Sequence, residues 1–179
     1  MPNHVRNVLK FSKLKPNERN FVLERFTTEM EDDIYPLNKI FDFDTIIPEP
    51  RLESECPEDC KVNKDSHVEE DKERPWFDWY VWRNKYWGTK WGAYDGYVKV
   101  GNTVVTFVFS TAWSAPIPIY EQLAKKYPDL TWEVRYADED IGSNCGIIQY
   151  NHNPGELDYY GEREISHPEQ FARRIWNNY

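Results

Sequence analysis

Apolar and polar positions divide the first third of the chain into three kinds of segment. Residues 5–11 alternate between the two classes, which predicts a half-buried strand. Residues 16–29 begin with proline and continue with apolar residues at helical spacing, which predicts a helix. Residues 38–50 are apolar but hold two prolines, so we expect an irregular segment packed on the core and no central strand.

The pattern in the rest of the chain predicts hairpins separated by single helices. We expect helices at 75–87, 117–127 and 166–176, and strands at 94–100, 103–109, 131–136, 145–150 and 156–161. The strand at 103–109 is apolar on both faces, which favours a central position in the sheet. This order predicts an α+β sandwich, an antiparallel sheet with helices packed mainly on one face.

Length and composition indicate one soluble domain with an unusually high content of aromatic residues. The 179 residues suit a single domain over 1–179, and 16% of them are aromatic, including 8 tryptophans. No apolar run approaches the roughly 18 residues of a membrane span, and the start has no signal-peptide pattern. We therefore expect a cytoplasmic protein that does not bind membranes.

The net charge is −9, and most of it falls in one segment. Residues 51–73 form an acidic insertion that we expect to be mobile, either a solvated loop or an arm that docks on a basic partner. The candidate partner-binding carboxylates of this acidic arm are Glu53, Glu55, Glu58, Asp59, Glu69, Glu70 and Asp71. Direct nucleic-acid binding is disfavoured by the net charge, although Lys10, Lys13 and Lys15 offer a local basic patch.

Tryptophan is concentrated between residues 76 and 91. A structural interpretation is that these indoles lock a helix to the sheet; a functional one is a stacking pocket for a nucleotide, or a protein interface. The candidate pocket residues are Arg83, Trp87, Lys90, Trp91, Tyr94 and Trp113.

The residue types needed for catalysis or metal binding are present but not in a recognised pattern. Cys56 and Cys60, with His67, could supply zinc ligands, but the second closely spaced pair of ligands that is typical of zinc sites is missing. Cys145 with His152 resembles a nucleophile and base only loosely, and a small residue on a strand is the simpler interpretation. An acidic run at 138–140 with Asp129 reads better as a loop tip than as a magnesium site. We expect no enzyme activity, no cofactor and no metal.

Three motifs carry a resemblance to a known family. They are Phe-Asp-Phe-Asp-Thr-Ile-Ile-Pro at 41–48, Trp-Gly-Thr-Lys-Trp-Gly-Ala-Tyr-Asp at 87–95 and Thr-Ala-Trp-Ser-Ala-Pro-Ile-Pro at 111–118. With the Met-Pro-Asn start, they resemble the YubB-type ferredoxin-like family of phage- and plasmid-encoded proteins, over residues 1–50 and 74–150. The resemblance implies a ferredoxin-like fold, a mobile-element origin and the cytosol of a bacterial host, but no established reaction.

Together these features favour a non-enzymatic interaction protein. We expect it to bind and inhibit a host protein, such as a nucleic-acid-binding defence effector, through an acidic and aromatic surface. The alternative is a small-ligand protein that holds a nucleotide against the tryptophan cluster.

Overall fold

An antiparallel sheet organises the chain. The computed structural model describes residues 3–29, 39–62, 72–152 and 158–179. Six strands pair in the order β4-β5-β1-β6-β7-β8, with β1 near the middle. Their bounds are β1 His4–Ser12, β4 Tyr94–Val100, β5 Val105–Ala112, β6 Thr131–Asp138, β7 Cys145–Asn151 and β8 Tyr159–Arg163.

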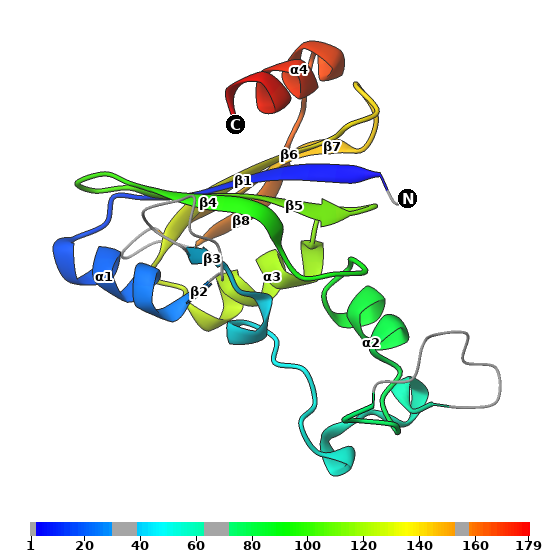
Figure 1. Ribbon diagram of the computed structural model, residues 1–179. Coiled ribbons are helices and arrows are strands. Elements are labelled where there is room, and N and C mark those ends of the chain that lie inside the picture. Colours follow the sequence, from blue (N-terminus) through cyan, green and yellow to red (C-terminus); the bar gives the residue numbers. More distant parts are fainter. Residues whose placement is uncertain (1–2, 30–38, 63–71, 153–157) are drawn as a thin grey trace.

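Helices lie on both faces of this sheet, but unequally. Helices α1 (Pro16–Arg25) and α3 (Ile117–Lys126) lie on one face, together with the short hairpin of β2 (Thr27–Glu29) and β3 (Lys39–Phe41). Among the described helices, α4 (Pro168–Asn178) is the one that lies on the other face (Figure 1). Helix α2 (Trp79–Tyr86) stands off one end of the sheet. Three 3-10 turns, at Phe43–Thr45, Glu53–Glu55 and Glu58–Cys60, connect β3 to α2.

The connection of these elements confirms the predicted fold class. Elements β1, α1, β4, β5, α3 and β6 follow the βαββαβ order of a ferredoxin-like fold, and every adjacent strand pair is antiparallel. The β7–β8 hairpin extends the sheet beyond β6. The two-sided apolar strand predicted at 103–109 is β5, which pairs with both β4 and β1 and is buried along its whole length.

The two faces have cores of different size. The face under α1 and α3 carries the main core, with Leu9, Phe107 and Phe109 among its fully buried side chains. The face under α4 carries a small cluster of five buried residues, Val8, Val108, Ala137, Ala172 and Ile175. Adjacent residues of one strand therefore belong to different cores, because successive side chains of a strand point to opposite faces of the sheet.

Two helices differ from the expected bounds. The helix expected at 16–29 ends at Arg25, because Thr27–Glu29 pairs with Lys39–Phe41 instead. The helix expected at 75–87 starts only at Trp79, because the Asp78 carboxylate caps it by accepting a hydrogen bond from the Val81 amide at 3.0 Å.

The described part of the acidic insertion is attached to α2. Cys56 and Cys60 are buried against the main core, and the Cys60 carbonyl accepts a hydrogen bond from the Asp78 amide at 2.9 Å. Lys61 and Phe77 form a single β-bridge. Residues 63–71 lie outside the described residues, so the mobility of the insertion stays a prediction.

None of the described helices combines the length and the apolar composition that crossing a membrane needs.

Candidate functional site: an aromatic–lysine cluster

The loop after α2 is fixed to the end of β5. Gly88 has a φ of +77°, and a Cβ at this position would lie 2.7 Å from the Cδ of Pro118, so only glycine fits. The Thr89 hydroxyl donates to the Ala112 carbonyl at 2.7 Å and accepts from the Ala112 amide at 3.2 Å. These contacts hold residues 87–91 against β5 and α3.

Trp113 follows β5 and has an unusual backbone. Its φ is +70°, a left-handed value that costs free energy in a residue with a Cβ, and its side chain is 41% exposed. The Trp113 amide donates to the Asn3 carbonyl at 2.9 Å, and the Trp113 carbonyl accepts from the Asn144 side-chain amide at 2.9 Å. The surrounding chain thus holds a large indole at the surface in a defined orientation.

Lys90 joins the aromatic rings into one cluster. Its ammonium lies 4.9 Å from the Trp91 ring centroid, 5.2 Å from that of Trp113 and 5.9 Å from that of Tyr80. The Tyr80 ring meets the Trp113 ring edge-on at 6.3 Å. We call Tyr80, Lys90, Trp91 and Trp113 the aromatic–lysine cluster. Cation–π contacts of this kind fix the lysine and keep its charge at the surface.

Tyr94, also predicted for the site, borders the cluster. Its ring lies 5.9 Å from the Trp91 ring, and its hydroxyl is 2.7 Å from the Nδ1 atom of His4. Burial, and then the charges of Asp95 and Glu139, raise the pKa of Tyr94 to about 12. Tyr94 is therefore a neutral phenol at neutral pH, and it supports the cluster from the side of β4.

Arg83 and Trp87, the other two predicted residues, lie in a neighbouring buried site. The Trp87 indole is 5% exposed and donates to the Ile47 carbonyl at 2.8 Å. The Arg83 guanidinium lies over the Trp87 ring at 5.1 Å and pairs with the buried Glu49 carboxylate. Arg74 pairs with the same carboxylate at 3.1 Å. These contacts attach α2 to the segment before it.

The described carboxylates of the acidic arm make mostly local contacts. Glu58 pairs with Lys61, and Asp59 with Lys85. Glu55 accepts hydrogen bonds from the amides of Arg51 and Leu52, which lower its pKa. Glu55 and Glu58 thus stabilise short turns, and Asp59 connects the arm to α2. Glu69, Glu70 and Asp71 lie outside the described residues.

Glu53 differs from those three carboxylates. Its side chain is exposed and makes no ion pair with another described residue. A partner could therefore pair with Glu53 without breaking an ion pair to a described residue.

The structure separates the residues that nucleophilic catalysis would need. Cys145 starts β7 and His152 follows its end, so about 20 Å of strand separates them. Burial raises the pKa of the Cys145 thiol and raises that of Cys60 to about 12. Both thiols are thus protonated, and weak nucleophiles, at neutral pH.

The proposed metal ligands are not gathered either. Asp138 is buried and accepts hydrogen bonds from Asn3 and Asn144, whereas Asp129 lies before the opposite end of β6. Over the described ranges, no three acidic, histidine or cysteine side chains converge as metal ligands would. His67 lies outside those ranges.

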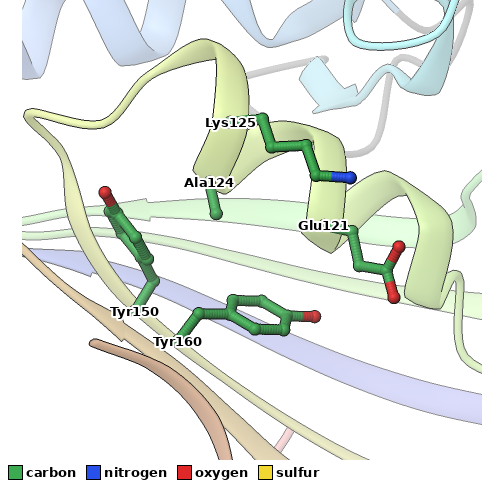
Figure 2. A pocket seen from close by; sticks show the side chains of 5 residues that line it. All are labelled: Glu121, Ala124, Lys125, Tyr150 and Tyr160. Carbon is green, nitrogen blue, oxygen red and sulfur yellow. The ribbon is translucent and has the colours of Figure 1, made fainter. Parts of the chain in front are cut away.

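A second candidate site is a hollow of about 440 Å³ between α3 and the β7–β8 hairpin (Figure 2). The rings of Tyr150 and Tyr160 form its sheet side, and Glu121 and Lys125 of α3 lie at its rim. Burial is the first cause that raises the pKa of each tyrosine to about 12. The two tyrosines therefore give the hollow a neutral aromatic surface at neutral pH.

Sequence reasoning missed some parts of both sites. Tyr80 of the cluster was not among the predicted residues, because its contact with Trp113 joins segments 33 positions apart. The tyrosine hollow depends on the pairing of Tyr150 with Tyr160 across the last hairpin. That hairpin was predicted, so its register is the signal that could have found the hollow.

The strand order and the helix arrangement place the chain among ferredoxin-like α+β proteins. The model of a family described as the ferredoxin-like domain in Api92-like protein matches residues 87–177, just over half of the chain. The chain belongs to this family. The match starts at Trp87, so it includes most of the aromatic–lysine cluster and α4, but not β1 or the acidic insertion. Neither the curated proteins nor the solved structures compared with the chain gave a match.

Proposed function

We propose that this chain is a non-catalytic interaction protein that binds another protein through the aromatic–lysine cluster. The observation that carries this proposal is Trp113, an exposed indole held at a left-handed backbone position by hydrogen bonds on both sides. Tryptophan and tyrosine dominate binding energy at protein interfaces, and a fixed side chain loses less entropy on binding.

The arrangement of Lys90 favours a protein over a nucleotide. A flat base that stacked on the face of Trp91 or Trp113 that Lys90 covers would have to displace the Lys90 ammonium from that ring. A partner carboxylate can instead pair with Lys90 from outside while the rings pack against neighbouring apolar atoms. The cluster therefore fits a partner surface with an acidic residue beside an apolar patch.

The finer parts of the proposal rest on the sequence. The resemblance to phage- and plasmid-encoded proteins supports a mobile-element origin, and the target would then be a host protein of the bacterial cytosol, such as a defence effector. The acidic arm would add long-range attraction to a basic partner, and Glu53 could pair with that partner without breaking an ion pair to a described residue.

A capture experiment tests the proposal. Tagged wild type, Trp113→Ala and Phe21→Ala are each incubated with bacterial lysate, and retained proteins are identified by mass spectrometry. Phe21 is a matched control, because it is 42% exposed and lies on α1, outside the cluster. We expect one stoichiometric protein with wild type and with Phe21→Ala, reduced at least tenfold with Trp113→Ala. Equal capture by all three would refute the role of the cluster.

The acidic arm is tested separately in the same assay. Because Cys56 and Cys60 are buried, deletion of the whole segment would disturb the core. Replacing Glu53, Glu69 and Glu70 with glutamine removes charge alone. We expect weaker capture with a smaller dependence on salt; an unchanged salt dependence would remove the arm from the proposal.

The nucleotide alternative makes a different prediction. If a base stacks on the cluster, nucleotides should quench tryptophan fluorescence in wild type and less in Trp113→Ala. Quenching of this kind, without protein capture, would favour a small-ligand function.

A further inference from the structure

A row of polar side chains crosses the α4 face of the sheet, at the end opposite the aromatic–lysine cluster. Lys99 of β4 pairs in register with Thr106 of β5, Thr106 with Lys10 of β1, and Lys10 with Glu133 of β6. Directly opposed residues point to the same face, and neighbouring strands lie about 4.8 Å apart. The four side chains therefore form one continuous line.

This line lies on the face that α4 covers only in part. Lys10 is two residues from Val8, and Thr106 is two residues from Val108, both members of the α4 cluster. The C-terminal end of α4 lies over the same side of the sheet (Figure 1). The row therefore lies on the same face as the small core, on the part of that face that α4 leaves open to solvent.

The row lines a hollow of about 320 Å³. Thr106 is 9% exposed, whereas Lys10 and Lys99 are exposed. Val8, Val104, Arg135 and Tyr179 complete the lining. A buried hydroxyl between two exposed ammonium groups is a suitable setting for an anion.

The charge here is opposite to that of the whole chain. Arg135 lines the hollow, and Arg163 of β8 lies on the same face two strands further along. The one side-chain carboxylate in the lining is Glu133, which pairs with Arg135 at 2.7 Å and with Arg163 at 3.5 Å. Within the described ranges, no carboxylate lies within ion-pair distance of Lys10 or Lys99. A local positive stripe thus exists in a protein of net charge −9.

Aromatic rings accompany these cations. The Lys99 ammonium lies 4.9 Å from the ring of Tyr179 and 5.2 Å from that of Tyr97. The Tyr179 side chain is 38% exposed. Cations in a line beside an exposed ring are the combination by which proteins bind single strands, with phosphates on the cations and bases stacked on the rings.

We propose that this face binds a single strand of nucleic acid, with phosphates on Lys10, Lys99 and Arg135 and a base against Tyr179. A strand fits better than a single phosphate, because the cations extend from β4 to β8 in a line. A duplex fits less well, because its dense charge would also meet the acidic surroundings. The row is about 20 Å from Trp113 along β5, so the proposal is independent of the protein-binding cluster.

Fluorescence anisotropy with a labelled oligothymidylate of about twelve nucleotides tests this proposal. The full chain is titrated at about 50 mM and about 200 mM salt, as wild type and as the double variant Lys10→Glu/Lys99→Glu. The matched control, Lys72→Glu/Lys126→Glu, makes the same charge change at exposed lysines that line neither the row nor the tyrosine hollow. Circular dichroism checks that each variant is folded.

We expect wild type and the control to bind within about threefold of each other, and the Lys10/Lys99 variant to bind at least tenfold more weakly. Tyr179→Ala should weaken binding about tenfold, the effect of one lost stacking contact. Wild-type binding should weaken steeply with salt.

Three outcomes would overturn the proposal. They are no binding by wild type at low salt, an equal loss in the control and Lys10/Lys99 variants, and displacement of the oligonucleotide by thymidine monophosphate at similar concentration. The last would identify a small phosphate ligand as the occupant. Trp113→Ala should bind the strand like wild type, so failure of this proposal and failure of the protein-binding proposal are distinguishable.

Discussion

The two faces of the sheet differ in what they leave exposed. The face under α1 and α3 is filled by a large apolar core, whereas the face under α4 has a cluster of five buried apolar residues and then a polar row. Adjacent positions of β5 show the contrast directly, since Phe107 enters the first core and Thr106 the polar row. In this fold one face supplies most of the stability, and the partly covered face and the ends of the strands are left available for binding.

The largest effect should come from the main core. Phe107 is fully buried and packs edge-on against Phe11 at 5.9 Å. Phe107→Ala removes this ring and leaves a cavity, so we expect a loss of about 4 kcal/mol in the free energy of unfolding, measured by urea denaturation. A loss below about 1 kcal/mol would mean that this face does not dominate stability.

The corresponding change on the α4 face should be smaller. Ile175 is 3% exposed and packs with Val8 and Val108. We expect Ile175→Ala to cost about 2 kcal/mol in the same measurement, because the smaller core can relax around the lost atoms. If it cost as much as Phe107→Ala, the two faces would be equivalent in stability.

A substitution at a backbone-restricted position should impair the aromatic–lysine cluster without removing side chains from either core. Gly88→Ala places a Cβ against Pro118 at a left-handed φ, which costs about 1–2 kcal/mol in backbone strain alone. We expect the loop at 87–91 to shift and capture of the partner protein to fall, while oligonucleotide binding is unchanged. Parallel loss of both activities would indicate that the two regions are coupled.

The smallest effect concerns pH and the buried thiol of Cys60. Burial raises its pKa to about 12 from an ordinary value near 9. Above about pH 9 the unfolded chain loses this proton while the folded chain keeps it, so the free energy of unfolding should fall as pH rises from about 9 toward 12.

Urea denaturation at about pH 8 and about pH 10 measures this fall. Cys60→Val keeps an apolar side chain of similar size without the thiol. Its stability should fall less between the two pH values than that of wild type. An identical fall in both proteins would assign the pH dependence to other groups, such as the buried tyrosines.

The sequence predicted most of the sheet, because periodicity reports burial directly. The run at 103–109, apolar on both faces, is the doubly buried β5. The C-terminal turn of the first helix was predicted wrongly, since Thr27–Glu29 pairs with a strand that begins ten residues later. Nothing in a local pattern indicates that competing contact.

The sequence predicted which residue types form the candidate site, but not which of their side chains face the surface and which face the core. Lys90, Trp91 and Trp113 were expected and do meet. Trp87 belongs to the same motif yet faces the core, and spacing alone does not tell which indole is buried. The row through Lys10 and Lys99 requires the strand order β4-β5-β1-β6, which no short motif contains.

Site-directed photo-crosslinking tests the central claim most directly. Benzoylphenylalanine is placed at position 113 or, as the control, at position 21, and the protein is irradiated in living bacterial cells. The account predicts one discrete crosslinked protein from position 113 and none from position 21. Identical crosslinks from both positions, or none from position 113 while the wild-type chain captures a partner, would contradict it.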